Sequence, residues 1–208
     1  MASPTKTVLF DLDGTLLDTA PDLAFALNAV RATRGGPPLE YARIRAVVSH
    51  GSFAMTRIGC AEPEGSTAFE EFRLELLDTY YENLADRTRL FEGMSELLDD
   101  FDMRGVRWGI VTNKPAWLTA PLLERLELDR RAASVVSGDT LPERKPHPAP
   151  LLLAAEQTAS RPGDCLYIGD AERDIVAGNA AGMRTLVALY GYLGSDARPE
   201  NWGADALV

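Results

Sequence analysis

Two acidic residues stand directly after an apolar run near the start of the chain. Residues 7–10, TVLF, are followed by Asp11, Leu12 and Asp13. If Leu12 turns into the interior, both carboxylates approach one small space, and their repulsion requires a metal ion or a shared proton. Such oxygen ligands suit a hard cation, for example Mg²⁺. On this segment alone, a pair of turn-forming or helix-capping acids remains the alternative.

A second acidic pair occurs late in the chain and is placed to serve the same ion. Asp170 and Asp174 lie four residues apart after the apolar run 166–168. If a helix starts at Ala171, the two carboxylates stack toward one end of it and act on one metal, directly or through a bound water. Taken singly, Asp170 could instead cap that helix. In combination with the first pair, we expect Asp170 to complete a metal site.

A hydroxyl and an ammonium group occur between the two acidic pairs. Thr112 ends the apolar run 108–111 and can donate to a phosphate oxygen or satisfy a neighbouring backbone group. Lys145 lies in segment 144–148, whose prolines restrict the backbone and delay the start of the helix that follows. In isolation Lys145 would be a surface lysine. With the acids, these two groups predict a site for an anionic substrate.

The elements that must position these side chains alternate between strand and helix. Continuous apolar runs of strand length occupy residues 7–10, 108–111, 134–136, 166–168 and 186–189. Such runs are typical of parallel strands that are buried on both faces. Helical patterns occupy residues 93–103, residues 116–126 and a segment with Ile175, Val176 and Ala180 that stops at Gly182. The alternation predicts an α/β fold with a doubly wound, Rossmann-like parallel sheet, whose functional groups gather beyond the carboxyl ends of the strands.

The gap between the first two apolar runs is too long for one crossover connection. It carries apolar stripes at helical spacing in residues 21–34 and 66–83, the first of them ending at Gly35-Gly36. We therefore predict an all-helical insert at residues 16–89. The remaining residues, 1–15 and 90–208, are predicted to form the catalytic core.

The composition limits the partners of the chain. The 208 residues carry a formal net charge of −10, which disfavours nucleic acid and anionic membranes as partners and leaves the binding of an anionic substrate to local groups. Cys60 and Cys165 lack the spacing of metal ligands and are predicted to be structural thiols. Because no signal peptide or membrane-spanning apolar run is recognised, we expect a cytoplasmic location.

In this order and spacing, the polar segments resemble the four motifs of the haloacid dehalogenase (HAD) superfamily, and within it the phosphoglycolate phosphatase-like group. The matching residues are Asp11-Leu12-Asp13-Gly14-Thr15, Thr112, Lys145-Pro146, and Gly169-Asp170 with Asp174. The resemblance covers essentially the whole chain. It implies a HAD core with the helical insert as a cap of the C1 type, and a Mg²⁺-dependent phosphomonoesterase that acts on a small phosphorylated metabolite.

The resemblance also implies a role for each core residue. Asp11 would attack phosphorus and form an aspartyl-phosphate, and Asp13 would protonate the leaving alcohol and later deprotonate water. Mg²⁺ would be held by Asp11, Asp170 and the backbone carbonyl of Asp13. Thr112 and Lys145 would hold the phosphoryl oxygens.

Further site residues follow from the same resemblance. Asp174 would steady the surroundings of the metal. Asn113 is predicted to contact the substrate beside Thr112, and Arg45, His50 and Gly51 of the insert belong to a segment that faces the pocket in relatives. A helix-ending glycine with exposed neighbours is the alternative for that segment.

The substrate is left open between two phosphorylated acids. Residues 90–94, 190–192 and 201–205 resemble the branch that hydrolyses N-acetylmuramic acid 6-phosphate, which motifs alone do not separate from enzymes acting on 2-phosphoglycolate. A phosphomutase on the same scaffold is a second hypothesis. A non-catalytic phosphometabolite-binding protein is a third, and it predicts a broken catalytic position, which the sequence does not contain. A monomer or a small homo-oligomer is expected.

The end of the chain departs from the family pattern. Relatives usually continue through a final strand and helix, whereas this sequence stops at Val208. Residues 204–208 are predicted to form that strand, with one face of the sheet thinly covered.

Overall fold

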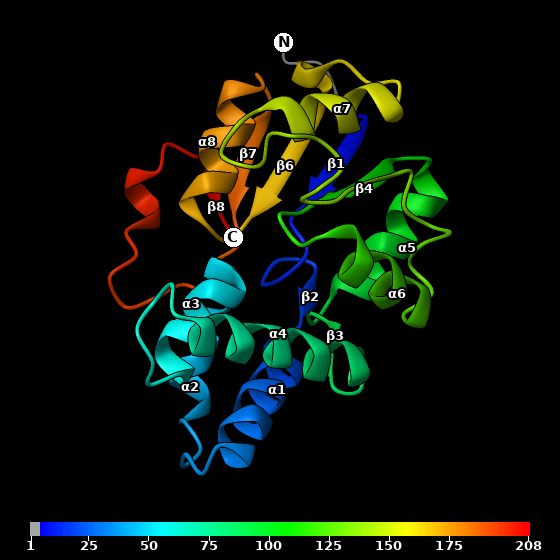
Figure 1. Cartoon of the computed structure of the whole chain (residues 1–208). Helices are drawn as coiled ribbons and strands as arrows, with labels where there is room; N and C mark the ends of the chain where they lie inside the picture. The colour runs from blue at the N-terminus through cyan, green and yellow to red at the C-terminus, as the bar shows by residue number, and fades with distance from the viewer. Residues whose placement is uncertain (1–4) are drawn as a thin grey trace.

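The computed structural model describes residues 5–208, and a six-stranded parallel sheet forms its centre (Figure 1). The strand order is β5-β4-β1-β6-β7-β8. The strands are β1 (Thr7–Phe10), β4 (Arg107–Val111), β5 (Ser134–Val136), β6 (Cys165–Gly169), β7 (Arg184–Val187) and β8 (Ala206–Leu207). All five predicted strands are confirmed, although the last begins and ends two residues earlier than expected. The predicted strand within 204–208 is also confirmed, as β8, which pairs with β7.

Helices cover both faces of the sheet, as expected for a doubly wound fold. They are α5 (Met94–Arg104), α6 (Ala116–Arg125), α7 (Ala149–Gln157) and α8 (Glu172–Ala180), with short 3₁₀ turns at Pro162–Asp164 and Pro199–Asn201. Alternate residues of β1 enter different cores: Val8 and Phe10 pack with α5 and α6, whereas Leu9 packs with α7 and α8. Each strand is therefore buried on both sides, which explains the continuous apolar runs.

An α-helical insert separates β1 from β4 and lies beyond the carboxyl edge of the sheet (Figure 1). It contains α1 (Ala20–Thr33), α2 (Tyr41–Arg45), the 3₁₀ turn Val48–His50, α3 (Gly51–Gly59) and α4 (Thr67–Glu82). Helix α4 begins where the Ser66 hydroxyl accepts a hydrogen bond from the Phe69 N–H at 3.2 Å, a standard N-cap. Helix α1 packs along α4 and also contacts α2 and α3.

A two-stranded ribbon joins the insert to the sheet. Strand β2 (Leu17–Asp18) pairs antiparallel with β3 (Arg89–Leu90). The ribbon was not predicted, because two-residue strands carry no periodicity. The expected boundaries of the insert, after residues 15 and 89, lie at this ribbon and remain a prediction.

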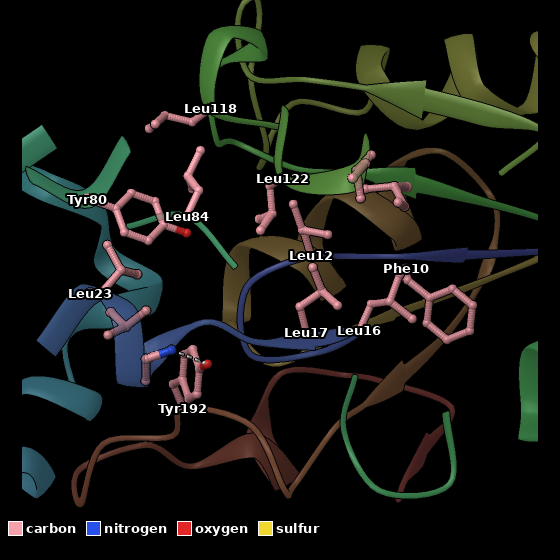
Figure 2. Packing of buried hydrophobic residues seen from close by; sticks show 14 of the residues in the cluster. Phe10, Leu12, Leu16, Leu17, Leu23, Tyr80, Leu84, Leu118, Leu122 and Tyr192 are labelled. Atoms are coloured by element: carbon pink, nitrogen blue, oxygen red, sulfur yellow. Dashed lines mark hydrogen bonds between the residues drawn. The ribbon is translucent and has the colours of Figure 1, made fainter. Parts of the chain in front are cut away.

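An apolar cluster fills the junction between insert and sheet. Figure 2 shows side chains of the β1 strand and the loop after it meeting those of α6 and the end of α4. The buried members drawn there include Phe10, Leu12, Leu16, Leu17, Tyr80, Leu84, Leu118 and Leu122. On the other side of this loop, the Tyr192 hydroxyl accepts a hydrogen bond from the Ala20 N–H at 2.9 Å (dashed in Figure 2) and donates to Asp18 at 2.7 Å. The first turn of the insert is thus fixed to the core.

Helix α8 differs in detail from its predicted pattern. Its buried face contains Ile175, Ala177 and Gly178, whereas Val176 is 43% exposed. Ala180 is exposed as well, so of the three residues used to predict this helix only Ile175 is buried.

No helix within residues 5–208 combines the length and apolar character needed to span a bilayer. Cys60 and Cys165 are free thiols.

Candidate active site

The predicted site residues meet at the carboxyl ends of three adjacent strands. Asp11 follows β1, Thr112 follows β4 and Asp170 follows β6. Strand β1 lies between β4 and β6, so the order of the strands reverses at β1. Open α/β sheets bind ligands at the carboxyl ends of the strands where the strand order reverses. Leu12 is fully buried, as the prediction for the Asp11–Asp13 segment required.

A cavity of 630 Å³ opens between this edge of the sheet and the helical insert. Its polar wall contains two carboxylates and several cationic side chains. Its apolar wall comes from both parts of the chain. The lining includes Asp11, Asp13, Thr112, Asn113, His50, Gly51, Arg73, Lys114, Arg144 and Arg173 on the polar side, and Leu23, Val48, Phe53, Met55, Leu76, Leu77, Trp117 and Leu118 on the apolar side.

Three buried carboxylates form one acidic cluster. Ligand oxygens of Asp11, Asp170 and Asp174 all lie within 4.8 Å of one another. Burial, together with the charges of Asp11 and Asp174, raises the pKa of Asp170 to about 7. Burial also raises the pKa of Asp11, with a further contribution from Asp174, although Lys145 opposes the shift. A cation among these oxygens would remove the cost of ionising all three.

Hydrogen bonds orient the cluster and leave one oxygen without a partner. Asp170 Oδ2 accepts from Ser49 Oγ and from the Tyr192 N–H, each at 2.8 Å, whereas Asp170 Oδ1 is buried without a partner among the described residues. Asp174 Oδ2 accepts the Ala171 N–H at 3.0 Å and so caps α8. The alternative that Asp170 caps this helix is therefore wrong, because the cap position is Ala171.

Glycines make room for the Asp170 carboxylate. A Cβ on Gly14 or on Gly191 would lie 2.3 Å from a side-chain atom of Asp170. Gly14 also has a φ of +90°, which other residues rarely adopt. A glycine is therefore required at position 14, both because of its positive φ and because Asp170 of the fourth motif lies so close to it.

Lys145 lies at the centre of the acidic groups. Its side chain is 1% exposed, and Nζ lies 2.9 Å from Asp11 Oδ1 and 2.7 Å from Asp174 Oδ1. Nζ also lies 2.7 Å from the Tyr167 hydroxyl, which can donate in turn to the Val111 carbonyl at 3.0 Å. Three N–H groups and one O–H thereby find acceptors. The alternative of a surface lysine is wrong.

Asp13 is held by groups from both parts of the chain. Its Oδ1 accepts from Thr19 Oγ1 at 2.6 Å and from Lys114 Nζ at 3.0 Å. Lys114 Nζ donates also to the Tyr80 hydroxyl of α4 at 3.1 Å. Burial lowers the pKa of Lys114, but Asp13 and Tyr80 outweigh it, so the net shift is upward and the ammonium form is favoured.

Thr112 and Asn113, the two residues that follow β4, make different contacts. Thr112 Oγ1 lines the cavity and accepts the Lys114 N–H at 3.1 Å, so its own proton remains to donate. Asn113 also lines the cavity, but its side chain bonds both backbone groups of Lys145: Nδ2 donates to O at 2.9 Å and Oδ1 accepts from N at 3.1 Å. Asn113 thus clamps the Lys145 segment, and its contact with substrate remains a prediction.

The structure separates the three predicted residues of the insert. His50 and Gly51 line the cavity, and Gly51 opens α3 with φ of +81°. Burial and nearby Arg173 lower the pKa of His50, which favours the neutral form of its ring. Arg45 is not among the lining residues: it donates to the Tyr190 carbonyl at 2.9 Å and lies over the Tyr192 ring. Its role in substrate contact remains a prediction.

Sequence reasoning missed several side chains at the cavity. Arg173 lies between the two acids of the fourth motif, and Lys114 follows Thr112 by two residues. Their closeness in sequence to predicted site residues could have identified both. Ser49 also had a signal, because it precedes His50 and Gly51, whereas Tyr80 had none, because only the docking of the insert brings it to Lys114.

Comparisons with known proteins agree with this site. Residues 8–188 match the family of haloacid dehalogenase-like hydrolases. A phosphoglycolate phosphatase of Xanthomonas campestris is 45% identical over 98% of this chain and 91% of that protein. An N-acetylmuramic acid 6-phosphate phosphatase of Pseudomonas aeruginosa is 43% identical over 98% and 90%. A crystal structure described as a predicted phosphoglycolate phosphatase from Haemophilus somnus is 29% identical, with a TM-score of 0.87 over 100% of this chain and 95% of that one.

The chain belongs to the haloacid dehalogenase-like hydrolases, and the helical insert is the cap of this α/β fold. Within the family it is a phosphoric monoester hydrolase. Of the four motifs, Asp11, Asp13 and Thr112 line the cavity, and Asp170, Asp174 and Lys145 lie in the cluster beside it.

Proposed function

We propose that the chain is a Mg²⁺-dependent phosphomonoesterase that works through an aspartyl-phosphate on Asp11. The observation that carries the proposal is the placement of Asp11. It ends the central strand, lines the cavity, lies in one cluster with Asp170 and Asp174, and pairs with Lys145 at 2.9 Å. A nucleophilic carboxylate needs this combination of substrate access and nearby positive charge.

The acidic cluster suits a divalent cation. Its donors are all oxygens, one of them a buried Asp170 oxygen without a protein partner among the described residues. We assign the ion to Asp11, Asp170 and the backbone carbonyl of Asp13, with Asp174 close enough to act directly or through a bound water. When bound, Mg²⁺ would supply positive charge against which the carboxylate and the phosphate can approach.

The first step is an in-line displacement at phosphorus. A carboxylate oxygen of Asp11 bonds to phosphorus while the bond to the ester oxygen breaks, and protonated Asp13 gives its proton to the leaving alcohol. Thr112 would donate a hydrogen bond to a phosphoryl oxygen, and Lys145, which pairs with Asp11, would supply positive charge beside the transferring group in the transition state.

The second step regenerates the enzyme. Asp13, now a carboxylate, takes a proton from water as the water oxygen bonds to phosphorus and the bond to Asp11 breaks. Inorganic phosphate leaves, and Asp13 is again protonated for the next cycle. The hydrogen bonds from Thr19 and Lys114 would hold Asp13 in one orientation through both steps.

The size of the cavity favours the larger of the two predicted substrates. A volume of 630 Å³ with a broad apolar wall is far more than a two-carbon acid fills. We therefore propose N-acetylmuramic acid 6-phosphate, or a phosphorylated sugar acid of similar size, ahead of 2-phosphoglycolate. The relatives carry both names. A cytoplasmic location and a monomer or small homo-oligomer stay predictions.

The test is phosphate release with and without Mg²⁺. Asp11→Asn should abolish turnover of every substrate while the variant keeps its fold by circular dichroism. Asp100→Asn, which removes a surface partner of Arg104 on α5, serves as the control and should retain activity. Phosphate release by Asp11→Asn at the wild-type rate would remove Asp11 as the nucleophile. Preference for 2-phosphoglycolate over the sugar acid would overturn the choice of substrate alone.

A further inference from the structure

Arg173 is a cationic wall residue that the proposed chemistry does not use. It is the second residue of α8, between the acids at positions 170 and 174, and it lines the cavity while being half-buried. Its Nη2 donates to the Ser49 carbonyl at 2.6 Å. The guanidinium is therefore held between the acidic cluster and the 48–52 segment of the cap.

In the part of the chain that the structure describes, Arg173 differs from the other buried or half-buried cationic side chains of the cavity in its lack of an ion pair. Arg73 is paired with Glu70 at 2.8 Å and Lys114 with Asp13 at 3.0 Å. Within residues 5–208, Arg173 makes no ion pair, and only one of its five N–H donors has a partner. Arg144 also lacks an ion pair, but it is an exposed side chain. In a chain of net charge −10, a half-buried arginine without a paired carboxylate at the cavity wall is a site for a ligand anion.

The transferring phosphoryl group is already served. In the proposed mechanism Thr112 and Lys145 would balance its charge, together with a cation if Asp11, Asp170 and Asp174 hold one. The acids at 11, 170 and 174 lie close enough to Arg173 to raise its pKa against the effect of burial, so its charge is permanent. A second anionic group on the substrate would find this guanidinium unpaired and oriented.

We propose that Arg173 binds the carboxylate of the substrate and thereby selects phosphorylated acids over phosphorylated neutral alcohols. Guanidinium and carboxylate match in planar geometry and form two parallel hydrogen bonds. The inference rests on the proposed function, both of whose candidate substrates carry a carboxylate besides the phosphate. It adds a specificity-determining residue to that function.

Two matched pairs of substrates test this role. The acid 2-phosphoglycolate is compared with ethyl phosphate, in which a methyl group replaces the carboxylate. N-acetylmuramic acid 6-phosphate is compared with N-acetylglucosamine 6-phosphate, which lacks the lactyl group that carries the carboxylate. Arg173→Met should lower kcat/KM for the preferred acid by about 10- to 100-fold, because charged hydrogen bonds are lost, and change that of its neutral partner by no more than about threefold. Arg173→Lys keeps the charge and should fall between wild type and Arg173→Met.

A binding measurement keeps the test independent of turnover. In the Asp11→Asn background, calorimetry should show the same selective loss of affinity for the acid when Arg173→Met is added. Wild-type protein that releases phosphate from none of the four esters would refute the proposed function, and the calorimetric comparison would still decide the role of Arg173.

Three results would overturn the assignment. Equal loss on both members of a pair would mean that Arg173 serves the phosphoryl group or the fold. Equal kcat/KM of the wild type for acid and neutral ester would mean that no carboxylate is recognised. Selective loss in the control Arg144→Met, with none in Arg173→Met, would move the carboxylate to the exposed arginine.

Discussion

Replacing Asp170 by asparagine should stabilise the metal-free protein near pH 8, although it removes a proposed metal ligand. Burial and the neighbouring acids raise the pKa of Asp170 from its ordinary value of 3.8 to about 7. A group with a raised folded-state pKa stabilises the fold below its unfolded-state pKa, and this contribution is lost as pH rises through the folded-state value. Wild-type protein should therefore lose stability between about pH 4 and pH 7.

The magnitude follows from the same pKa. At about 1.4 kcal/mol per tenfold change in proton affinity, ionising Asp170 costs up to about 4 kcal/mol at pH 8. Asparagine is neutral at every pH and can keep the hydrogen bonds from Ser49 and Tyr192. We expect Asp170→Asn to raise the free energy of unfolding by about 2–4 kcal/mol at pH 8 without metal, and by much less at pH 5.

Urea unfolding in a chelator, at several pH values, measures this difference. With Mg²⁺, wild type should gain stability by mass action and Asp170→Asn should gain little. Asp22→Asn is the matched control: it is another fully buried acid, which accepts hydrogen bonds from the N–H groups of Arg87 and Thr88 and from the Thr88 hydroxyl. That variant should be destabilised and indifferent to Mg²⁺. If Asp170→Asn is less stable than wild type in chelator at pH 8, the conclusion that ionised Asp170 destabilises the metal-free fold is refuted.

Two further predictions concern the neighbours of this cluster. Asp13→Asn should lower kcat by about 100- to 10,000-fold, because a general acid-base group is lost. It should also lower the free energy of unfolding, though by less than Lys145→Met does, because an amide can still accept a hydrogen bond from Lys114 but no longer balances its charge. Steady-state kinetics and urea unfolding check both. Lys145→Met should lower the free energy of unfolding by about 3–5 kcal/mol near pH 8, because it leaves Asp11 and Asp174 buried without their cation. That loss should shrink as the pH is lowered, because burial raises the pKa of Asp11 and favours its neutral form, and on addition of Mg²⁺; a loss that is constant across pH would contradict the proposed charge balance.

The sequence was sufficient to predict the sheet and the residues at its edge for one physical reason. Parallel strands buried on both faces are continuous apolar runs, and their carboxyl ends meet at one edge. Polar residues after such runs must therefore converge, as Asp11, Thr112 and Asp170 do. Lys145 was predicted at the site only in combination with the acids and through the resemblance, since its own segment would indicate a surface lysine.

The contacts between cap and core were beyond the reach of the sequence. The β2–β3 ribbon has only two residues in each strand, too few for any periodicity. Tyr80 reaches the site from helix α4, whose pattern indicates burial but not the partner, and Ser49 reaches it from a three-residue 3₁₀ turn, which has no pattern. The packing angle between cap and core depends on side chains such as Leu12, Leu84 and Leu122, which are apolar in any arrangement of the two parts.

These contacts connect the cap to the groups proposed to do chemistry. Ser49 bonds Asp170, and Tyr80 shares Lys114 with Asp13, so one cap residue touches a proposed metal ligand and another is a single side chain away from the proposed general acid. A movement of the cap would therefore change the hydrogen bonds of both carboxylates as well as the volume of the cavity. Because the same segment also holds Arg173 through the Ser49 carbonyl, recognition of the substrate and readiness of the acids depend on one arrangement of the cap. Substitutions in the 48–52 segment should accordingly act on kcat and KM together, as expected where a lid completes a catalytic site.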